Sequence, residues 1–345
     1  MRSWKELAVI GGTLLLSSGL IVGCGSDDSG SGDASASASD TALVLYSGRS
    51  EELVGPLIER VGGTVPVKAT YDRKAAQILE EGDRSPADLF FAQDAGELGA
   101  LAEAGLLAPL PEDIKNAVLE PYRSETGGWV PTSARSRVLI YNPNNIGESE
   151  LPEGIDGLLA QRFRGQVGYA PTNASFKSFV TALRLVRGED GARDWLTKFL
   201  ANDPKKFDGN GAIVEAVNSG SLATGLTNHY YWVQEINEKG AAAVPSKLHF
   251  FSNGDPGALV NVAGIGVLKS SKKQEQAFEF ARQLLTPETQ EFFATEVGEY
   301  PVIEGVQLNV AGIPPLSELQ PPKINLDDLS DVQGTEKLLT EVGAI

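Results

Sequence analysis

Hydrophobic and polar positions follow two alternating periods along the chain, beginning at residue 43. Short apolar runs predict buried strands at 43–46, 65–71 and 88–92. Between them, apolar residues at helical spacing predict helices at 50–61, 72–82 and 94–107. Strands that alternate with helices in this way are typical of a largely parallel sheet covered by helices.

A second series of the same kind follows. It contains predicted strands at 137–141, 166–170 and 222–227 and predicted helices at 175–186 and 211–220. The long apolar segment 258–269 has no obvious place in this second series, and helical patterns at 272–285 and 287–297 come after it. We therefore expect a chain that leaves one domain and returns to it, which gives two lobes joined by more than one crossover and able to close over a cleft.

The N-terminal segment predicts export and anchoring. Arg2 and Lys5 precede an uncharged run at 7–22, which is shorter than the roughly 20 apolar residues of a membrane-spanning helix, so 1–23 is predicted to be a signal peptide. The only cysteine, Cys24, follows this run and resembles the lipidated cysteine of a bacterial lipobox; the alternative is a cysteine that merely follows a conventional cleavage site. Residues 24–40 are predicted to be the lipidated cysteine and a flexible tether, because 26–40 has no apolar residue larger than alanine.

Composition excludes several functions. The formal net charge of −17 argues against nucleic acid and against polybasic membrane contact. If the single cysteine is lipidated, the protein has neither a disulfide nor a thiolate metal site. We therefore expect any metal to be bound by oxygen or imidazole.

Motifs of enzymes are absent from the sequence. Neither histidine, His229 or His249, lies in an HExxH pattern, and there is no GxSxG or GxxxxGK motif. The neighbouring acids Glu80 and Glu81 are the remaining candidate for surface catalysis, but no base, nucleophile or metal set accompanies them. We expect a binding protein and no enzyme.

The loops that follow the predicted strands are the candidates to line one cleft, because ligands of open parallel sheets bind beyond the carboxyl ends of the strands. These loops are 47–50, 92–95, 171–175 and 227–232. The last one, TNHYYW, contains the adjacent residues Tyr230 and Tyr231. Adjacent side chains share a task only in a turn or in the first turn of a helix, because on a strand they point to opposite faces.

Two phenols side by side indicate a hard, highly charged cation. The phenol pKa is near 10, so iron(III) displaces the proton at neutral pH, whereas zinc and calcium ordinarily bind other ligands. Two phenolates leave one positive charge on ferric iron and open positions for an anion or further protein oxygens. The simpler alternative is that Tyr230 and Tyr231 pack the edge of a core.

Seven segments in register resemble the periplasmic ferric-ion-binding proteins, the iron-loaded receptors of ABC import systems. They are LVLYSGRS, EEGDRSPADLFFAQDAGELGALAEAGLLAPL, SARSRVLIYNP, GQVGYAPTNASF, NHYYW, DPGALVNVAGIGVLK and EYPV. The resemblance implies an α/β, two-lobed, hinged, type II-like periplasmic binding fold, with a mainly parallel sheet in each lobe. We expect lobe 1 at 41–135 plus 261–311 and lobe 2 at 136–260 plus 312–345.

The resemblance also implies the site. It assigns ferric iron to Tyr230 and Tyr231 and an exogenous anion, such as phosphate, carbonate or citrate, to the remaining positions. The residues that match the anion-binding positions are Asn173, Ala174, Ser175, Asn210, Asn228, Arg135 and Arg137. Backbone N–H groups at the start of the predicted helix 175–186 would favour the anion, although Asn173 or Ser175 could equally be an ordinary helix cap.

The chain departs from the family at two positions. Ser50 stands where well-known members have a histidine, and Gln93 stands where they have a glutamate. Glu51 and Asp94, one residue further on, could ligate iron or could simply complement a helix dipole. With two ligands lost, we expect a stronger dependence on exogenous oxygen donors; the alternative is a small organic ion held against Tyr230 and Tyr231 as an aromatic wall.

The resemblance implies partners and location as well. We expect a monomer that delivers its ligand to an ABC transporter permease from outside the cytoplasm, anchored to the membrane through lipidated Cys24.

Overall fold

The computed structural model describes residues 42–61, 63 and 65–345. The predicted signal peptide, Cys24 and the tether lie outside the described residues. Within those residues no helix is long and apolar enough to cross a membrane.

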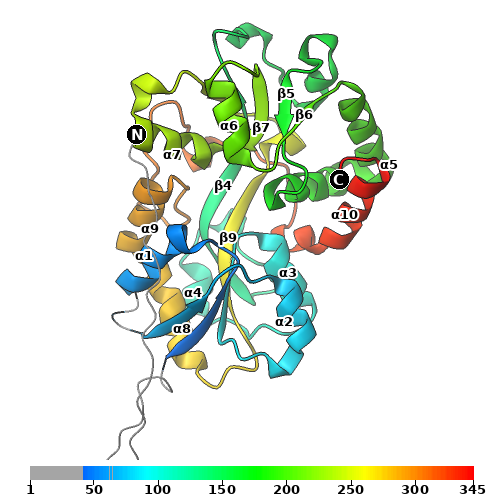
Figure 1. Cartoon of the computed structure of the whole chain (residues 1–345). Helices are drawn as coiled ribbons and strands as arrows, with labels where there is room; N and C mark the ends of the chain where they lie inside the picture. Colours follow the sequence, from blue (N-terminus) through cyan, green and yellow to red (C-terminus); the bar gives the residue numbers. More distant parts are fainter. Residues whose placement is uncertain (1–41, 62, 64) are drawn as a thin grey trace, which may run out of the picture. The chain divides into compact units, whose positions relative to one another are not determined.

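The described chain forms one mixed sheet with helices around it (Figure 1). The strand order is β2-β1-β3-β9-β4-β7-β5-β6, and β8 pairs with β4. The strands are β1 (Leu43–Ser47), β2 (Val67–Thr70), β3 (Leu89–Ala92), β4 (Trp129–Tyr141), β5 (Val167–Tyr169), β6 (Lys205–Lys206), β7 (Thr224–Asn228), β8 (Lys247–His249) and β9 (Val260–Val267).

Ten α-helices are found among the described residues. They are α1 (Glu51–Val61), α2 (Ala75–Glu81), α3 (Ala95–Glu103), α4 (Glu112–Asn116), α5 (Ala174–Ala201), α6 (Asn210–Asn218), α7 (His229–Lys239), α8 (Gln274–Leu284), α9 (Pro287–Phe292) and α10 (Val332–Glu341). Each strand and helix that the hydrophobic pattern predicts is present, with shifted ends. The α/β prediction is therefore confirmed.

Two long strands connect the halves of the sheet. The strands β1, β2 and β3 pair in parallel, and so do β5, β6 and β7, as expected for alternating strands and helices. Between these sets, β4 and β9 run antiparallel to each other and to their outer neighbours β7 and β3. We call β1–β3 with α1–α3 the first half and β5–β7 with α5–α7 the second half.

The apolar segment 258–269, which had no obvious place in the second series, contains β9. Sequence alone did not place it because its partners β3 and β4 are far away along the chain, and such pairing leaves no local signal. Two further elements differ from the pattern. The helix predicted at 287–297 ends as α9 at Phe292 and continues as the π-helical turn Phe293–Val297, and α5 continues past the predicted helix through a kink at Gly188.

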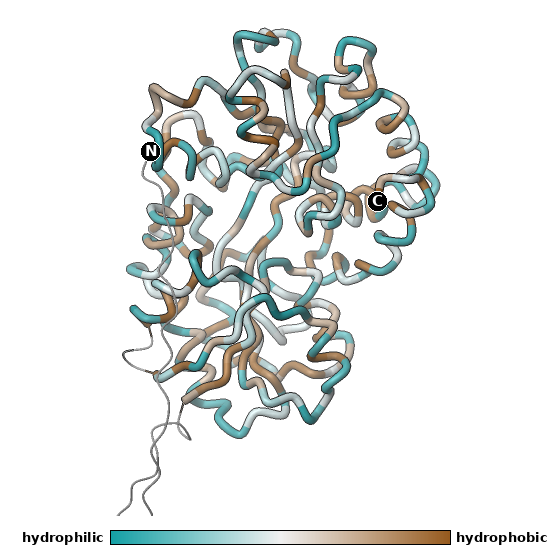
Figure 2. Tube along the Cα trace, viewed as in Figure 1, coloured by the Kyte–Doolittle hydropathy of each residue, from teal (hydrophilic) through white to brown (hydrophobic). Residues whose placement is uncertain are grey.

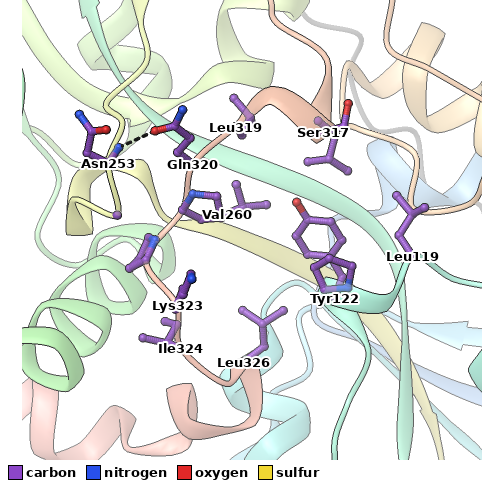
Figure 3. A pocket seen from close by; sticks show the side chains of 15 residues that line it. Leu119, Tyr122, Asn253, Val260, Ser317, Leu319, Gln320, Lys323, Ile324 and Leu326 are labelled. Carbon is purple, nitrogen blue, oxygen red and sulfur yellow. Dashed lines mark hydrogen bonds between the residues drawn. The ribbon is translucent and has the colours of Figure 1, made fainter.

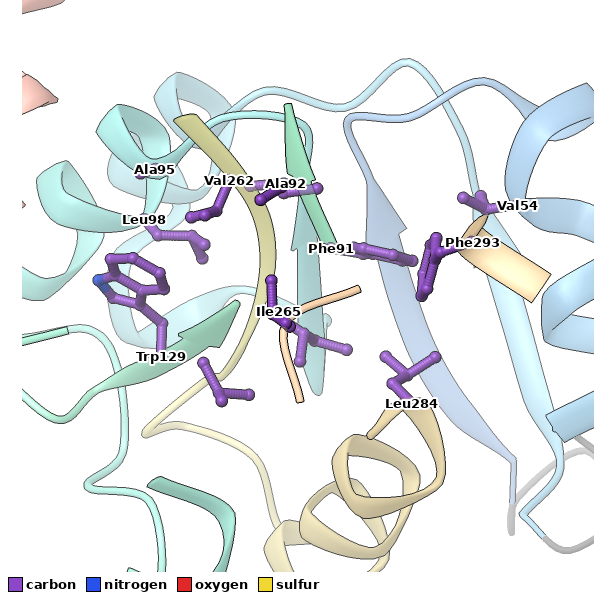
Figure 4. Close-up of a cluster of buried hydrophobic side chains, with 14 of the residues drawn as sticks. Val54, Phe91, Ala92, Ala95, Leu98, Trp129, Val262, Ile265, Leu284 and Phe293 are labelled. Atoms are coloured by element: carbon purple, nitrogen blue, oxygen red, sulfur yellow. The ribbon is translucent and has the colours of Figure 1, made fainter. Parts of the chain in front are cut away.

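Two hydrophobic clusters form the core. In the first, apolar residues of the first half pack against β9, α8 and the π-helical turn, among them Phe91, Leu98, Ile265, Leu284 and Phe293 (Figure 4). The second is built on α5 with Phe176, Phe179 and Trp195. Hydrophobic residues are frequent along the central strands, and hydrophilic residues are frequent along the outer helices and loops (Figure 2), as burial of apolar surface requires.

Candidate functional site

Tyr230 and Tyr231 lie in the first turn of α7, directly after β7. Their rings stack with centroids 4.3 Å apart and an interplanar angle of 28°. Tyr230 is buried, whereas Tyr231 is partly exposed. At the start of a helix the two adjacent side chains can lie next to each other, whereas on a strand they would point to opposite faces.

Tyr230 is a protonated phenol at neutral pH. Burial raises the pKa of Tyr230 well above its ordinary value, and the neighbouring Tyr231 and Glu299 raise it further against the lowering effect of Arg135. A ligand that binds the phenolate form must therefore displace a proton from a buried group. A weakly charged cation does not compensate that cost, and a hard trivalent cation does.

His229 stands beside the pair and supports the helix start. Its Nδ1 accepts a hydrogen bond from the Ser136 N–H at 3.1 Å, and its ring stacks on Tyr300 at 4.5 Å. Burial lowers the pKa of His229 to about 4, so the imidazole is neutral at physiological pH. Among the described residues no three His, Cys, Asp or Glu side chains form a metal-binding group.

A buried ion pair lies near Tyr230, and the sequence did not predict it. Arg49 donates to both oxygens of Glu299 at 2.7 and 3.0 Å, and the Ser133 hydroxyl donates at 2.5 Å. Burial would raise the pKa of Glu299, but Arg49 and Arg135 outweigh it and hold this pKa below its ordinary value. Arg49 lies in LVLYSGRS and Glu299 lies in EYPV, two of the segments that resemble the family. Nothing in the sequence near either residue indicates that the two pair with each other.

Two arginines on β4 present free donors to a small cavity. Arg135 and Arg137 are each 2% exposed and line this cavity together with Asn228. The Nε and Nη1 atoms of Arg135 and the Nε of Arg137 have no hydrogen-bond partner among the described residues. Burial lowers the pKa of Arg137 to about 9, and its guanidinium lies 5.2 Å from the ring centre of Phe179. Buried cations with unused donors are suited to an anion.

Helix N-termini face the same end of the second half. Asn173 caps α5, because its Oδ1 accepts hydrogen bonds from the Ser175 N–H at 2.9 Å and from the Ser175 hydroxyl at 2.8 Å. Asn210 begins α6, donates to the Ser175 hydroxyl at 2.9 Å and has an unpartnered buried Oδ1. The ordinary capping that the sequence left open is therefore present, in a position that also favours an anion. Ala174 is the first residue of α5, and Asn228 precedes α7 without a side-chain capping bond.

The candidate ligands predicted in the first half, Ser50, Glu51, Gln93 and Asp94, differ in their exposure. Ser50 and Glu51 are exposed at the start of α1, and Gln93 is partly exposed after β3. No hydrogen bond joins any of these three to the tyrosine pair in the described part of the chain. Asp94 is 5% exposed and turned inward, where it caps α3 and accepts side-chain hydrogen bonds. Ligation by any of the four stays a prediction.

A large cavity of about 870 Å³ lies elsewhere (Figure 3). Its walls are mainly apolar, with Tyr122, Val260 and Ile324 among them, and a hydrogen bond of 3.0 Å joins the Asn253 N–H to Gln320 Oε1 in its lining. It contains none of the tyrosines or arginines described above. The buried charges and free donors of Arg135 and Arg137, rather than the volume of this cavity, make the neighbourhood of Tyr230 and Tyr231 the candidate site.

The chain is similar to known ferric-binding proteins. Residues 84–325 match the family model described as "Bacterial extracellular solute-binding protein". The major ferric iron-binding protein of Neisseria meningitidis serogroup B is 32% identical over 309 residues, which cover 87% of this chain and 92% of that protein.

Two solved structures extend the similarity to the fold. Iron-bound HitA from Pseudomonas aeruginosa has a TM-score of 0.81 at 35% identity and covers 88% of this chain and 99% of its own. The Trichodesmium protein IdiA (FutA), solved in complex with iron and citrate, has a TM-score of 0.75 at 28% identity with the same coverage. The chain therefore belongs to the bacterial extracellular solute-binding proteins and, within them, to the family of two-lobed periplasmic ferric-ion-binding proteins.

Proposed function

We propose that this protein captures ferric iron through the phenolates of Tyr230 and Tyr231, together with an exogenous anion. The observation that carries the proposal is the stacked tyrosine pair at the start of α7, next to two buried arginines with unused donors. The phenols supply two hard oxygen ligands, and Arg135 and Arg137 supply the charge that an anion needs. The protein acts as a binding protein and not as an enzyme.

The charge of ferric iron explains why an anion would bind with it. Two phenolates neutralise two of the three charges of ferric iron, and the remaining positions need oxygen donors. Phosphate, carbonate and citrate each supply them, and the N-termini of α5 and α6 add favourable dipoles. The Trichodesmium relative was solved with iron and citrate, which is consistent with a small oxygen-rich anion in this chain as well.

Iron binding measured with and without the anion tests this function. Ferric iron is exchanged from a competing chelator to the purified protein in anion-free buffer and in buffers with phosphate, carbonate or citrate. We expect coloured, tight binding that weakens at least about tenfold when the anion is withdrawn, because Ser50 and Gln93 replace two charged or imidazole ligands. Equal affinity in all buffers would contradict the role of the anion, and a colourless protein in every buffer would favour a small organic ion against an aromatic wall.

Delivery requires a membrane partner. Iron held between the lobes stabilises the closed form by its differential affinity, and we propose that an ABC importer permease recognises that form. Anchoring through lipidated Cys24 would keep the monomeric receptor outside the cytoplasm and close to this permease.

A further inference from the structure

Asp94 connects the two halves of the sheet. It follows β3 in the first half, and its Oδ2 accepts a hydrogen bond of 2.5 Å from the hydroxyl of Ser178 on α5 in the second half. The same oxygen accepts from Asn261 Nδ2 on β9 at 2.6 Å. The Ser178 hydroxyl also lies 3.0 Å from the Ala174 carbonyl oxygen, but its single proton favours the shorter contact with the carboxylate.

The other carboxylate oxygen keeps Asp94 in place. Asp94 Oδ1 accepts from the Gly96 N–H at 2.9 Å and thereby caps α3. The cap fixes the direction of the carboxylate, so Oδ2 remains aimed at α5 and β9. Asp94 therefore orients one charged oxygen at the point where the first half, the second half and a crossover strand meet.

Asp94 also faces Arg135 without occupying its donors. Arg135 Nη2 lies 3.9 Å from Asp94 Oδ2, which is too long for a hydrogen bond but close enough for strong attraction between buried charges. Nε and Nη1 of Arg135 have no partner among the described residues. The carboxylate thus compensates the buried cation while its hydrogen-bonding groups stay available to a ligand.

We propose that Asp94 is a positioning residue that joins the two halves across the floor of the site and holds Arg135 ready for the anion bound with iron. This inference rests on the proposed function, because it assigns Asp94 to closure over the same site. It makes iron retention depend on a residue that does not ligate the metal. Loss of the Ser178 contact weakens closure, and loss of the charge also misplaces Arg135.

The test compares three variants of the full chain. Asp94→Asn keeps an acceptor for the Gly96 N–H, since asparagine is also a good N-cap, but removes the charge. Ser178→Ala removes only the contact between the halves. The control, Asp255→Asn, makes the same change at a capping aspartate whose hydrogen bonds all come from the backbone N–H groups of Gly257 and Ile155.

The measurement is the rate at which ferric iron is lost to a competing chelator in phosphate buffer, together with the visible spectrum. We expect Asp94→Asn to release iron roughly ten- to a hundredfold faster, as loss of a hydrogen bond to a charged group implies, and Ser178→Ala to show part of this increase. The wavelength of the phenolate-to-iron band should stay unchanged in both variants, and Asp255→Asn should release iron at the wild-type rate.

Two results would overturn the inference. Wild-type release from both Asp94→Asn and Ser178→Ala would leave Asp94 as a helix cap alone. A shifted band in Asp94→Asn with wild-type release from Ser178→Ala would make Asp94 a metal ligand. If the wild type binds no iron, the proposed function fails, and the role of Asp94 needs a separate measurement. Small-angle X-ray scattering with phosphate alone supplies it. A radius of gyration that falls in the wild type and not in Asp94→Asn supports the inference, and equal behaviour of the two proteins overturns it.

Discussion

At the scale of single residues, Arg137 is a buried cation without an ion-pair partner in the described part of the chain. The rings of Phe176 and Phe179 and weak hydrogen bonds to Ser175 and Leu226 are its compensation. Burial lowers the pKa of its guanidinium to about 9, because the surroundings of Arg137 disfavour the charged form. An arginine in such a place is retained at a cost in stability, and an anionic ligand would offset that cost.

Arg137→Met should therefore separate stability from binding. We expect the free energy of unfolding of the iron-free protein to rise by about 1–2 kcal/mol, because the uncompensated charge is removed, while phosphate affinity falls at least about tenfold. Urea unfolding and calorimetric phosphate titration measure the two effects. Arg187→Met, which removes a partly exposed arginine paired with Asp156, is the control and should change neither by much. A destabilised Arg137→Met with unchanged phosphate affinity would assign Arg137 to structure alone.

Single residues also mark the limit of sequence reasoning. The adjacency of Tyr230 and Tyr231 was informative because only a turn or a helix start gives neighbouring side chains one task. The pair of Arg49 and Glu299 was not predictable, because its members lie 250 positions apart and nothing local links them. For Asp94, the sequence predicted either an iron ligand or a residue that complements a helix dipole. The contacts of its second carboxylate oxygen with Ser178 and Asn261 depend on the fold and could not be predicted.

At the scale of elements, the position of α7 depends on the π-helical turn Phe293–Val297. Gln234 and Asn237 of α7 donate to the carbonyl oxygens of Val297 and Thr295. Gly298 ends the turn with a φ of 77°, and a Cβ there would lie 2.7 Å from Val233 Cγ1 on α7. Only glycine permits both this backbone conformation and this close approach.

Gly298→Ala should displace the helix that carries the tyrosines. We expect a loss of about 3 kcal/mol in the free energy of unfolding, from backbone strain and overpacking together, and a weaker phenolate band. The matched control is Gly305→Ala, where φ is 83° but no atom lies within 4 Å of a Cβ, so strain alone should cost about 1 kcal/mol. Equal losses in the two variants, measured by urea unfolding, would argue against the close packing of α7.

Glu97 makes the packing of α3 against the start of α2 dependent on pH. Burial raises the pKa of Glu97 to about 7 from an ordinary value of 4.5; Lys74 opposes this rise, and Asp94 adds to it. Between these values the folded state holds a proton that the unfolded state has lost. The contribution of Glu97 to stability is therefore complete below pH 4.5 and is lost as the pH rises through about 7.

Glu97→Gln should consequently stabilise the protein at pH 8 and not at pH 4.5. The expected gain at pH 8 is on the order of 2–3 kcal/mol in the free energy of unfolding. Denaturation at both pH values measures it, with Glu80→Gln, an exposed glutamate on α2, as the control. A gain that is the same at both pH values would show that the charge of Glu97 is not responsible.

Elements were predicted well where the signal is local and poorly where it is not. The alternation of strands with helices gave the parallel sets β1–β3 and β5–β7, because hydrophobic periodicity reports each element by itself. The antiparallel course of β4 and β9 depends on pairing between distant segments. The kink at Gly188 and the π-helical turn are features of backbone conformation, which the spacing of hydrophobic residues does not report.

At the scale of the whole molecule, the sheet topology places the residues of the proposed site where the two halves meet. The tyrosines and the starts of α5 and α6 come from the second half, Asp94 comes from the first, and Arg135 and Asn261 come from the strands β4 and β9 that connect them. A ligand at this place contacts both halves and the connection between them. Binding and closure are then expected to be one event.

Cys24→Ser tests how the whole protein is held at the membrane. If lipidation at Cys24 is the anchor, the variant should move from the membrane fraction to the soluble extracytoplasmic fraction, while purified variant and wild type bind iron equally. Fractionation followed by immunodetection measures the shift. A variant that stays in the membrane fraction would contradict anchoring through Cys24.

The central claim is tyrosine ligation of ferric iron, and one visible spectrum tests it most directly. Purified wild type, Tyr230→Phe, Tyr231→Phe and a control receive ferric iron as a weak chelate with phosphate. The control is Tyr71→Phe, which removes a partly exposed phenol directly after β2, outside the proposed site. We predict a phenolate-to-iron charge-transfer band in the wild type and in Tyr71→Phe, and its weakening or loss in each of the other two variants. A band that persists in Tyr230→Phe and Tyr231→Phe alike, or a wild type that remains colourless with every anion, would contradict the account.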